Sequence, residues 1–379
     1  MKICFIFNPC SGKNRRRPWL VPVIREFIAT HGLAAEVIPT ERPGHATQLA
    51  REALAAGCEQ VVAVGGDGTM NEVAQALIGA SAALGLVPCG SGNGLALHLG
   101  IPTNPRAALR LLADPRAQVV AIDTGTANGH PFCNAMGVGF DAEISRRFNR
   151  LARRGFLAYA RTGLAAYVRF LPQTVTISNG YASAERLEAF IVAVANSDQY
   201  GNYARIAPRA RVDDGALDLI AIRPLNLLST ATLVARLFMG SVDRSTRVRR
   251  LRGRRFVIER PVPGLLHTDG ETHDAEARVE VIVRPHSLRI VVPAHSPVAR
   301  PGAAGVNPKP ENAPGNTNLE TPNPKQFRKI EMFKIGFSPR LNFPAISAFG
   351  FSFCFGFRTS DFEFSPPSPW KRNACTCAP

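Results

Sequence analysis

No apolar run in the sequence approaches the roughly 20 residues that a transmembrane helix requires. The first strand-like stretch, Lys2 to Phe7, is too brief for the apolar core of a signal peptide, so we expect no secretory signal. The eight cysteines are scattered and form no paired C-x-x-C units, which argues against a zinc site. We therefore expect a reduced, cytoplasmic protein whose contact with membranes, if any, is peripheral at the inner face.

Acidic residues are scarce beside basic ones, with 29 Asp and Glu against 45 Lys and Arg and a formal net charge of +16. This balance favours acidic partners such as nucleic acid, nucleotides or an anionic membrane surface. The sequence contains no helix-turn-helix, zinc-finger or aromatic–basic RNA motif, so we expect no nucleic-acid partner. Its 379 residues and hydrophobic content of 45% suffice for two globular domains.

A Gly-Gly-Asp-Gly-Thr turn at residues 65–69 carries the clearest chemical signal. It follows a short apolar strand, Val61 to Val64, and a helical pattern begins directly after it. Glycines let the backbone approach a bulky anion, and the positive end of the helix attracts that anion. Asp67 would repel a bare phosphate, which suggests a bridging cation such as the magnesium of a nucleotide. An ordinary strand-to-helix turn with a capping acid is the alternative interpretation.

The first 120 residues alternate strand and helix patterns, which is typical of a doubly wound α/β domain with a parallel sheet. Strands are predicted at Ile3–Phe7, Ala35–Pro39, Val61–Val64 and Ala83–Val87. In such sheets ligands bind at the carboxyl ends of the strands. The stretches that lie there are Asn8 to Lys13, Thr40, Gly65 to Thr69 and Gly90 to Asn93. Four loops at one edge predict a phosphate site, although the first lacks the spacing of a P-loop.

From about residue 121 to 295 the pattern changes to short strands, which predicts a mainly β domain of two packed antiparallel sheets. Helical patterns interrupt it only near Asp141–Leu171 and Leu225–Met239. Residues 296–379 begin with a stretch rich in Pro, Asn and Gly and continue into a phenylalanine-rich segment without clear periodicity. We expect this third part to be poorly ordered and assign it no function.

These motifs closely resemble those of the diacylglycerol kinase catalytic family, which includes bacterial lipid kinases and sphingosine kinases. The resemblance covers roughly residues 1–295. The segments similar to the family's nucleotide loops are Asn8–Gly12, Gly65–Glu72 and Gly90–Ala96. The segments similar to its β-domain signatures and its catalytic segment are Asn196–Gly201, Val212–Gly215 and Asp269–Glu271. One departure is Gly94, since many bacterial diacylglycerol kinases carry an acid there.

The resemblance implies a phosphofructokinase-like or NAD kinase-like nucleotide domain, a β-sandwich domain and a cleft between them. It implies transfer of the γ-phosphate of ATP to a hydroxyl of a diacylglycerol-like or sphingoid lipid. Glu271 would be the general base, and Asp67 would act on the phosphates through Mg²⁺. ATP would contact Asn8, Ser11, Gly12, Lys13, Thr40, Gly66, Asp67, Gly68, Thr69, Asn71, Glu72 and Ser91. A structural Mg²⁺ would bind Asp214 and the main-chain oxygens of Arg211 and Ala216.

Simpler interpretations of the last two sites stay open. Asp269 and Gly270 also suit a type I′ hairpin turn that leaves Glu271 in solvent. Asp213 and Asp214 also suit an ordinary turn between strands. For the whole protein, the alternatives are a kinase of a soluble substrate, as in NAD kinases, and a catalytically silent regulator that binds nucleotide or lipid. The sequence leaves a monomer and a homodimer open.

Two clusters of arginines give a hypothesis for access to a lipid substrate. The first cluster is Arg146, Arg147, Arg150, Arg153, Arg154 and Arg161, interleaved with large apolar residues. The second is Arg244, Arg247, Arg249, Arg250, Arg252, Arg254 and Arg255. Basic residues close to an anionic lipid surface contribute about 1 kcal/mol each to binding, so either cluster could dock the protein. Charge that merely keeps the protein soluble is the alternative.

Overall fold

The computed structural model describes residues 1–12, 14–149, 172–180 and 184–298. Lys13, most of the first arginine cluster and nearly all of the segment predicted to be poorly ordered lie outside these ranges. Residues 1–309 form one compact unit, to which the description below refers. Within the described ranges, no helix combines the length and the apolar character needed to traverse a bilayer.

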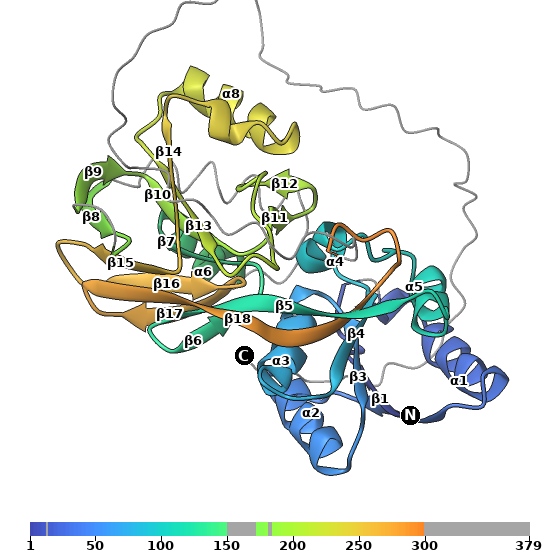
Figure 1. Cartoon of the computed structure of the whole chain (residues 1–379). Helices are drawn as coiled ribbons and strands as arrows, with labels where there is room; N and C mark the ends of the chain where they lie inside the picture. The colour runs from blue at the N-terminus through green and yellow to red at the C-terminus, as the bar shows by residue number, and fades with distance from the viewer. Residues whose placement is uncertain (13, 150–171, 181–183, 299–379) are drawn as a thin grey trace, which may run out of the picture. The chain divides into compact units, whose positions relative to one another are not determined.

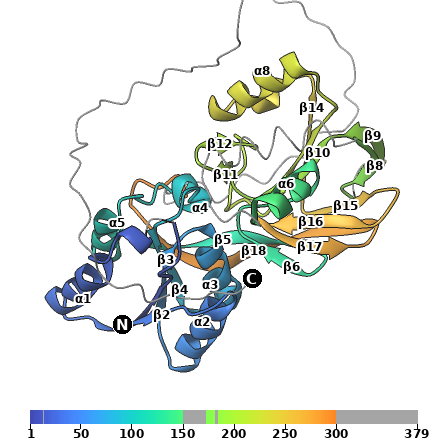
Figure 2. The ribbon, with the colours of Figure 1, turned by 180° about the vertical axis from the view of Figure 1, so that it is seen from behind.

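The N-terminal region is a parallel sheet with helices on both faces, as predicted (Figure 1). Its strand order is β2 (Ala34–Pro39), β1 (Lys2–Phe7), β3 (Gln60–Gly65) and β4 (Ala83–Pro88). The helices are η1 (Asn14–Arg16), α1 (Leu20–Thr30), α2 (His45–Ala55), α3 (Asp67–Leu77), α4 (Gly94–His98) and α5 (Pro105–Leu112). β1, β3 and β4 bury side chains on both faces, because α1 and α5 cover one face and α2 and α3 cover the other (Figure 2).

One long strand, β18 (Arg278–Val292), joins this region to the rest of the unit. It pairs in parallel with β4 and in antiparallel with β5 (Gln118–Ala127) and β15 (Arg255–Glu259). The first sheet therefore continues through β18 and β15 to β8 (Gln173–Ser178) and β9 (Glu185–Ala189). The sequence predicts two strands where β18 runs, and the pairing is irregular between Arg284 and Leu288. A boundary near residue 120 falls inside β5.

A second, antiparallel sheet packs on the extension of the first, so the β sandwich is confirmed. Its strand order is β14 (Val248–Gly253), β13 (Leu217–Ile222), β10 (Ile191–Ala195), β7 (Ala135–Gly139), β16 (Gly264–Thr268) and β17 (Glu271–Ala275). The core between the sheets includes Phe132, Phe256, Met136 and Leu219. On the outer face, α8 (Leu227–Phe238) contributes Leu233 to a second apolar cluster with Ala193 and Ile220 of the sheet.

Two segments predicted as single strands are each divided in the structure. The stretch 131–136 becomes β6 (His130–Phe132) and β7, with a break at Cys133 and Asn134. The stretch 187–195 becomes β9 and β10, which lie in different sheets and are separated by Phe190. The small elements that remain are α6 (Phe140–Asn149), β11 (Gln199–Gly201), β12 (Ala204–Arg205) and η2 (Val242–Arg244).

Candidate active site

The Gly-Gly-Asp-Gly-Thr turn joins β3 to α3 and is tied to the loop that follows β1. The N–H of Gly66 donates to Ser11 Oγ at 2.6 Å, and Asn8 Nδ2 donates to Thr69 Oγ1 at 2.9 Å. These hydrogen bonds hold two of the predicted phosphate loops together. Because α3 starts at Asp67, the N–H groups of its first turn point out of the end of the helix, where they can bind an anion.

The loop after β4 approaches the other two loops so closely that only glycine fits. A Cβ atom on Gly90 would lie 2.7 Å from Gly66 Cα, and one on Gly12 would overlap the carbonyl oxygen of Cys89. Gly12 also has a positive φ of 49°, which favours glycine. The structure thus brings three of the four predicted loops together through their backbones. Thr40 begins the fourth loop and is buried, and its N–H donates to the carbonyl of Phe7 at 2.8 Å.

Asp67 holds the third loop in place. Its Oδ2 accepts the N–H of Asn93 at 2.8 Å, and its Oδ1 accepts the N–H of Gly94 at 2.7 Å. Gly94, where the family resemblance leads us to expect an acid, therefore supports Asp67 through its backbone. Each carboxylate oxygen accepts one of these bonds and keeps lone-pair capacity for a further contact.

The remaining predicted nucleotide residues differ in their surroundings. Asn71 is fully buried, and neither atom of its amide group has a hydrogen-bond partner among the described residues. Glu72 Oε2 accepts the N–H of Ala46 at the start of α2, at 3.0 Å. Gly68 and Ser91 are exposed, and Lys13 lies outside the described residues. Asn71 stands out, because a buried amide without partners carries a cost that a bound ligand could remove.

Asp269 and Gly270 form the two-residue turn between β16 and β17. Their φ angles of 49° and 87° are both positive, as a type I′ turn requires. The carboxylate of Asp269 accepts the N–H groups of Cys133, Asn134 and Ala135 at 2.6, 2.8 and 3.0 Å. These donors are the two residues of the break between β6 and β7 and the first residue of β7. The break therefore serves to anchor the hairpin, which the sequence did not reveal.

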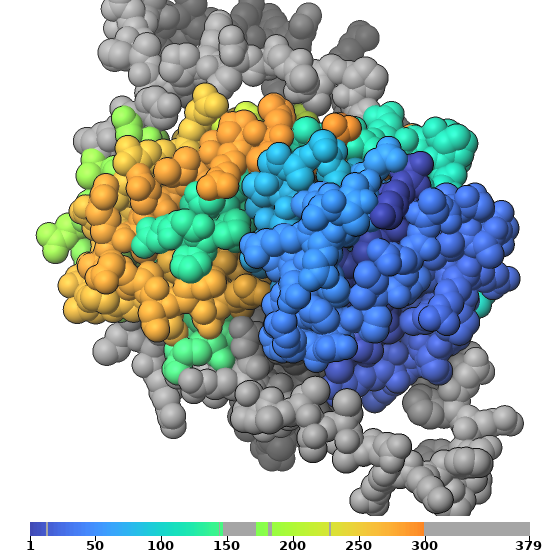
Figure 3. Space-filling view, turned by 90° about the horizontal axis from the view of Figure 1, so that it is seen from below, coloured from blue at the N-terminus to red at the C-terminus, as the bar shows by residue number. Residues whose placement is uncertain are grey.

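Glu271 is half-buried at the start of β17, so it is not the solvated residue of the simpler interpretation. Burial raises its pKa above the ordinary glutamate value, and the charges of Glu72 and Asp269 raise it further. α3, which carries Glu72, contacts β6 and β18 of the β region, and Figure 3 shows the light-blue part of the chain beside the teal and orange parts.

A buried histidine–aspartate pair that the sequence did not reveal lies beside the hairpin turn. His267 Nε2 is 2.7 Å from Asp141 Oδ2, which also accepts the hydroxyl of Tyr200 at 2.8 Å. Burial by itself would lower the pKa of His267, but the charge and hydrogen bond of Asp141 outweigh it and raise that pKa. The N–H of Gly270 points to His267 Nδ1 at 3.4 Å, which connects the pair to the turn. A Cβ on Gly137 would overlap Asp141 Oδ2. Nothing in the local sequence marks this pair, because His267 and Asp141 are 126 positions apart in the chain.

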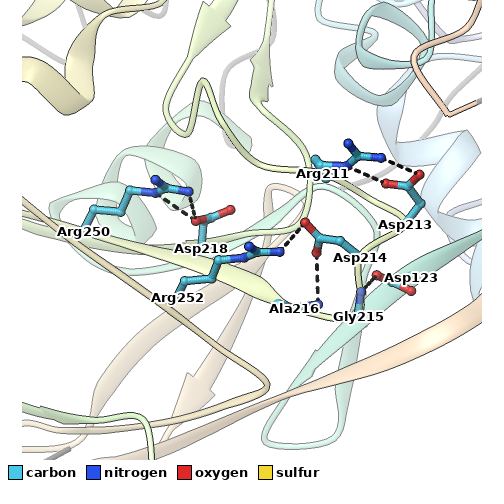
Figure 4. Close-up of polar contacts among 9 residues, drawn as sticks. All are labelled: Asp123, Arg211, Asp213, Asp214, Gly215, Ala216, Asp218, Arg250 and Arg252. Atoms are coloured by element: carbon cyan, nitrogen blue, oxygen red, sulfur yellow. Dashed lines mark hydrogen bonds and ion pairs between the residues drawn. The ribbon is translucent and has the colours of Figure 1, made fainter. Parts of the chain in front are cut away.

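The predicted structural magnesium site lies in the turn before β13 (Figure 4). Asp214 Oδ1 accepts the N–H of Ala216 at 3.2 Å, and Asp214 Oδ2 pairs with the guanidinium of Arg252. Arg211 makes two hydrogen bonds to Asp213, both at 3.1 Å. An arginine on the only carboxylate of the predicted ligand set does not fit a divalent cation there. The described residues include no group of three or more His, Cys, Asp or Glu side chains arranged for a metal ion.

Comparisons with known proteins agree with these observations. Residues 2–127 match the model of the diacylglycerol kinase catalytic domain, and residues 134–292 match that of the YegS C-terminal NAD kinase beta sandwich-like domain. A Pseudomonas aeruginosa (strain UCBPP-PA14) protein named probable lipid kinase YegS-like is 35% identical over 307 residues, covering 79% of this chain and 97% of that protein. The diacylglycerol kinase of Bacillus subtilis (strain 168) is 32% identical over 241 residues, covering 61% and 78%.

The comparison of folds agrees with the sequence comparisons. The crystal structure of a diacylglycerol kinase from Bacillus anthracis str. Sterne aligns with a TM-score of 0.58 at 19% identity, covering 77% of this chain and 96% of that one. The two matched domain models and the Pseudomonas aeruginosa relative indicate the same family, and the fold agrees with it. The chain belongs to the family of lipid kinases that have a diacylglycerol kinase catalytic domain and a YegS-type β-sandwich domain.

Proposed function

We propose that the protein transfers the γ-phosphate of ATP to a hydroxyl group of a diacylglycerol-like lipid, with Glu271 as the general base. The observation that carries this proposal is the contact of α3, the helix that follows the Gly-Gly-Asp-Gly-Thr turn, with β6 and β18 of the β region. This contact supports a site in which the glycine loops face the hairpin that carries Glu271, as phosphoryl transfer from nucleotide to alcohol requires. The name of the Bacillus subtilis relative favours a diacylglycerol-like acceptor over a sphingoid one.

Each part of the site has a task in this reaction. The N–H groups at the start of α3 and the glycine loops would bind the phosphates, and Asn71 would donate its buried amide to the nucleotide. Glu271 would accept the proton of the lipid hydroxyl as the phosphorus–oxygen bond forms. Its raised pKa suits this task, because a stronger base accepts a proton more readily as long as it stays ionised at the working pH.

Magnesium bound with ATP would neutralise charge on the β- and γ-phosphates. Asp67 fits this ion, because its oxygens keep lone pairs beside the hydrogen bonds to Asn93 and Gly94. Nucleotide-bound Mg²⁺ generally needs one or two carboxylates, since phosphates and water supply the other ligands.

We also propose that the protein works peripherally at the inner membrane face, but with a smaller basic surface than the sequence suggests. Of the second arginine cluster, four members are in ion pairs within the protein: Arg249, Arg250, Arg252 and Arg255. Arg244, Arg247 and Arg254 have no ion-pair partner among the described residues. These three are the candidates for anionic lipid headgroups, and liposome binding that ignores salt and anionic lipid content would contradict their role.

A phosphorylation assay with labelled ATP tests the proposed reaction. The full chain is incubated with a lipid extract and, in parallel, with NAD, and the product is identified by mass. We expect label in a lipid phosphate and none in NADP. Label in NADP alone would favour a soluble substrate. Binding of ATP without transfer to any lipid would favour a regulator without catalytic activity.

A further inference from the structure

The turn before β13 brings together three arginines and three aspartates as ion pairs. Arg211 pairs with Asp213, Arg252 with Asp214, and Arg250 with Asp218, as Figure 4 shows. Asp214 and Asp218 have side-chain exposures of 18% and 3%, so both charges are removed from much of the solvent. Each of these three aspartates therefore has an arginine of the protein as its partner.

The position of Arg252 follows from the pairing of β14 with β13. In this antiparallel ladder, Arg252 lies opposite Asp218 and Arg250 lies opposite Ile220. Side chains two residues apart on a strand point to the same face, so both guanidinium groups reach the same side of the sheet. Arg250 takes the carboxylate of Asp218, and Arg252 extends past it to Asp214.

The same turn is fastened to the strands that join the two regions of the unit. The N–H of Gly215 donates to Asp123 Oδ2 at 2.6 Å, and the N–H of His286 donates to Asp123 Oδ1 at 2.8 Å. Asp123 lies on β5 and is fully buried, and His286 lies on β18. Asp123 therefore fastens this turn to β5 and β18 through two backbone N–H groups.

We propose that the guanidinium of Arg252 is the permanent counter-ion of Asp214 and takes the place of a divalent cation at this turn. Arginine keeps its charge at every physiological pH, so the pairing needs no metal supply. A divalent cation at Asp214 would have to displace Arg252 or lie beside it against charge repulsion. Removing the guanidinium would leave the Asp214 carboxylate without its cationic partner, and a carboxylate oxygen is a ligand that suits Mg²⁺ or Ca²⁺.

Thermal unfolding of the full chain without nucleotide tests this inference. We expect the Tm of the wild type to be the same in EDTA, in Mg²⁺ and in Ca²⁺. R252A should lower the Tm in EDTA by about 2–6 °C, and millimolar Mg²⁺ or Ca²⁺ should restore part of the loss. R252K should behave as the wild type, because it retains a cation.

Two further variants make the outcome decisive. R249A removes the same charge from the same strand, where Arg249 pairs with Glu185 at 2.9 Å, and it should show no response to metal. A rise in the Tm of the wild type with metal that disappears in D214N would overturn the proposal, as would an R252A protein indifferent to metal. If R252A does not fold, R252Q retains the side-chain length and is measured in its place. The experiment measures stability and not activity. A result that contradicts the counter-ion proposal therefore leaves the proposed kinase reaction untouched.

Discussion

The two halves of the candidate site are held together by different kinds of interaction. On the α/β side, three loops meet through their backbones, with glycines at the closest approaches and few charged groups. On the β side, carboxylates hold a hairpin in place. Asp269 accepts hydrogen bonds from three backbone N–H groups, and Asp141 pairs with His267. The first half is suited to receiving an anion, whereas the second fixes a single carboxylate, Glu271, with an altered pKa.

This difference indicates where each half is sensitive. Backbone loops depend on the absence of side-chain atoms, so adding a methyl group should damage them. The hairpin depends on charges inside the protein, so removing a charge should damage it.

The largest effect is expected on catalysis from E271Q, which keeps the shape of the side chain and removes its basicity. Loss of a general base typically costs 10²–10⁴-fold in rate, so kcat should fall by about that factor. ATP binding, measured by calorimetry, should stay near the wild-type value. A kcat within threefold of wild type would remove Glu271 from the proposed mechanism.

The next largest effect is expected on stability from D141A. It leaves His267 buried without its charged partner, and breaking a buried pair in this way costs about 3–5 kcal/mol. Denaturant unfolding measures the change. The control is D114A, whose pair with Arg116 is at the surface and should leave the unfolding midpoint unchanged. Equal midpoints for both variants would refute the supporting role of the Asp141–His267 pair.

A smaller effect is expected from G90A on the α/β side. The added Cβ would lie 2.7 Å from Gly66 Cα, and relieving such an overlap typically costs about 1–3 kcal/mol. Because the loops must move apart, the Kd for ATP should rise about tenfold. G253A is the matched control, since its Cβ would lie 3.4 Å from Asn179 Cβ, an ordinary contact far from the loops. Unchanged ATP affinity in G90A would show that the close approach is not needed for binding.

N71L separates the two kinds of sensitivity, because it should weaken the use of ATP without lowering the stability of the fold. The amide of Asn71 is buried without a described partner, so an apolar replacement of similar volume removes an unsatisfied group. Unfolding without nucleotide should require the same free energy or about 1 kcal/mol more. The KM for ATP should rise. A destabilised N71L protein with normal KM would mean that the amide serves the fold.

The smallest effect concerns the pH dependence of stability. A carboxyl group with a raised pKa in the folded state stabilises the fold below its unfolded pKa, and this contribution is lost as pH rises through the folded pKa. Ionised Glu271 is therefore unfavourable at pH 8, and E271Q should be more stable than wild type there. The difference should shrink as pH falls towards 4. In kinetics, the acidic limb of kcat/KM should lie above the ordinary glutamate pKa of about 4.3.

The sequence predicted the α/β side well because its signals are local. Glycine motifs directly after apolar strands located the loops at 8–12, 65–69 and 90–93, and the parallel sheet followed from the alternation of patterns. The Asp-Gly turn at 269–270 is also a local signal, and the sequence offered it as the simpler interpretation of that segment. β14 escaped notice because it reads Val-Arg-Arg-Leu-Arg-Gly, which lacks apolar alternation, and its pairing with β13 creates the strand.

The supports of the hairpin could not be predicted, because they join residues far apart in the chain. Asp269 meets Cys133 across 136 positions, and His267 meets Asp141 across 126. Nothing in the local sequence marks such a pair. The second arginine cluster shows the same limit, since a dense run of positive charge does not reveal which arginines are paired, and four of its members neutralise acids within the protein.

The long strand β18 has a consequence for how the polypeptide acquires its structure during synthesis. β4 is complete by residue 88, yet its neighbour in the sheet starts only at residue 278. Until the ribosome has made that stretch, the growing N-terminal part carries an unprotected sheet edge, the kind of surface on which chains aggregate. We expect a fragment that stops before residue 278 to precipitate or to need a chaperone, even though it contains every glycine loop.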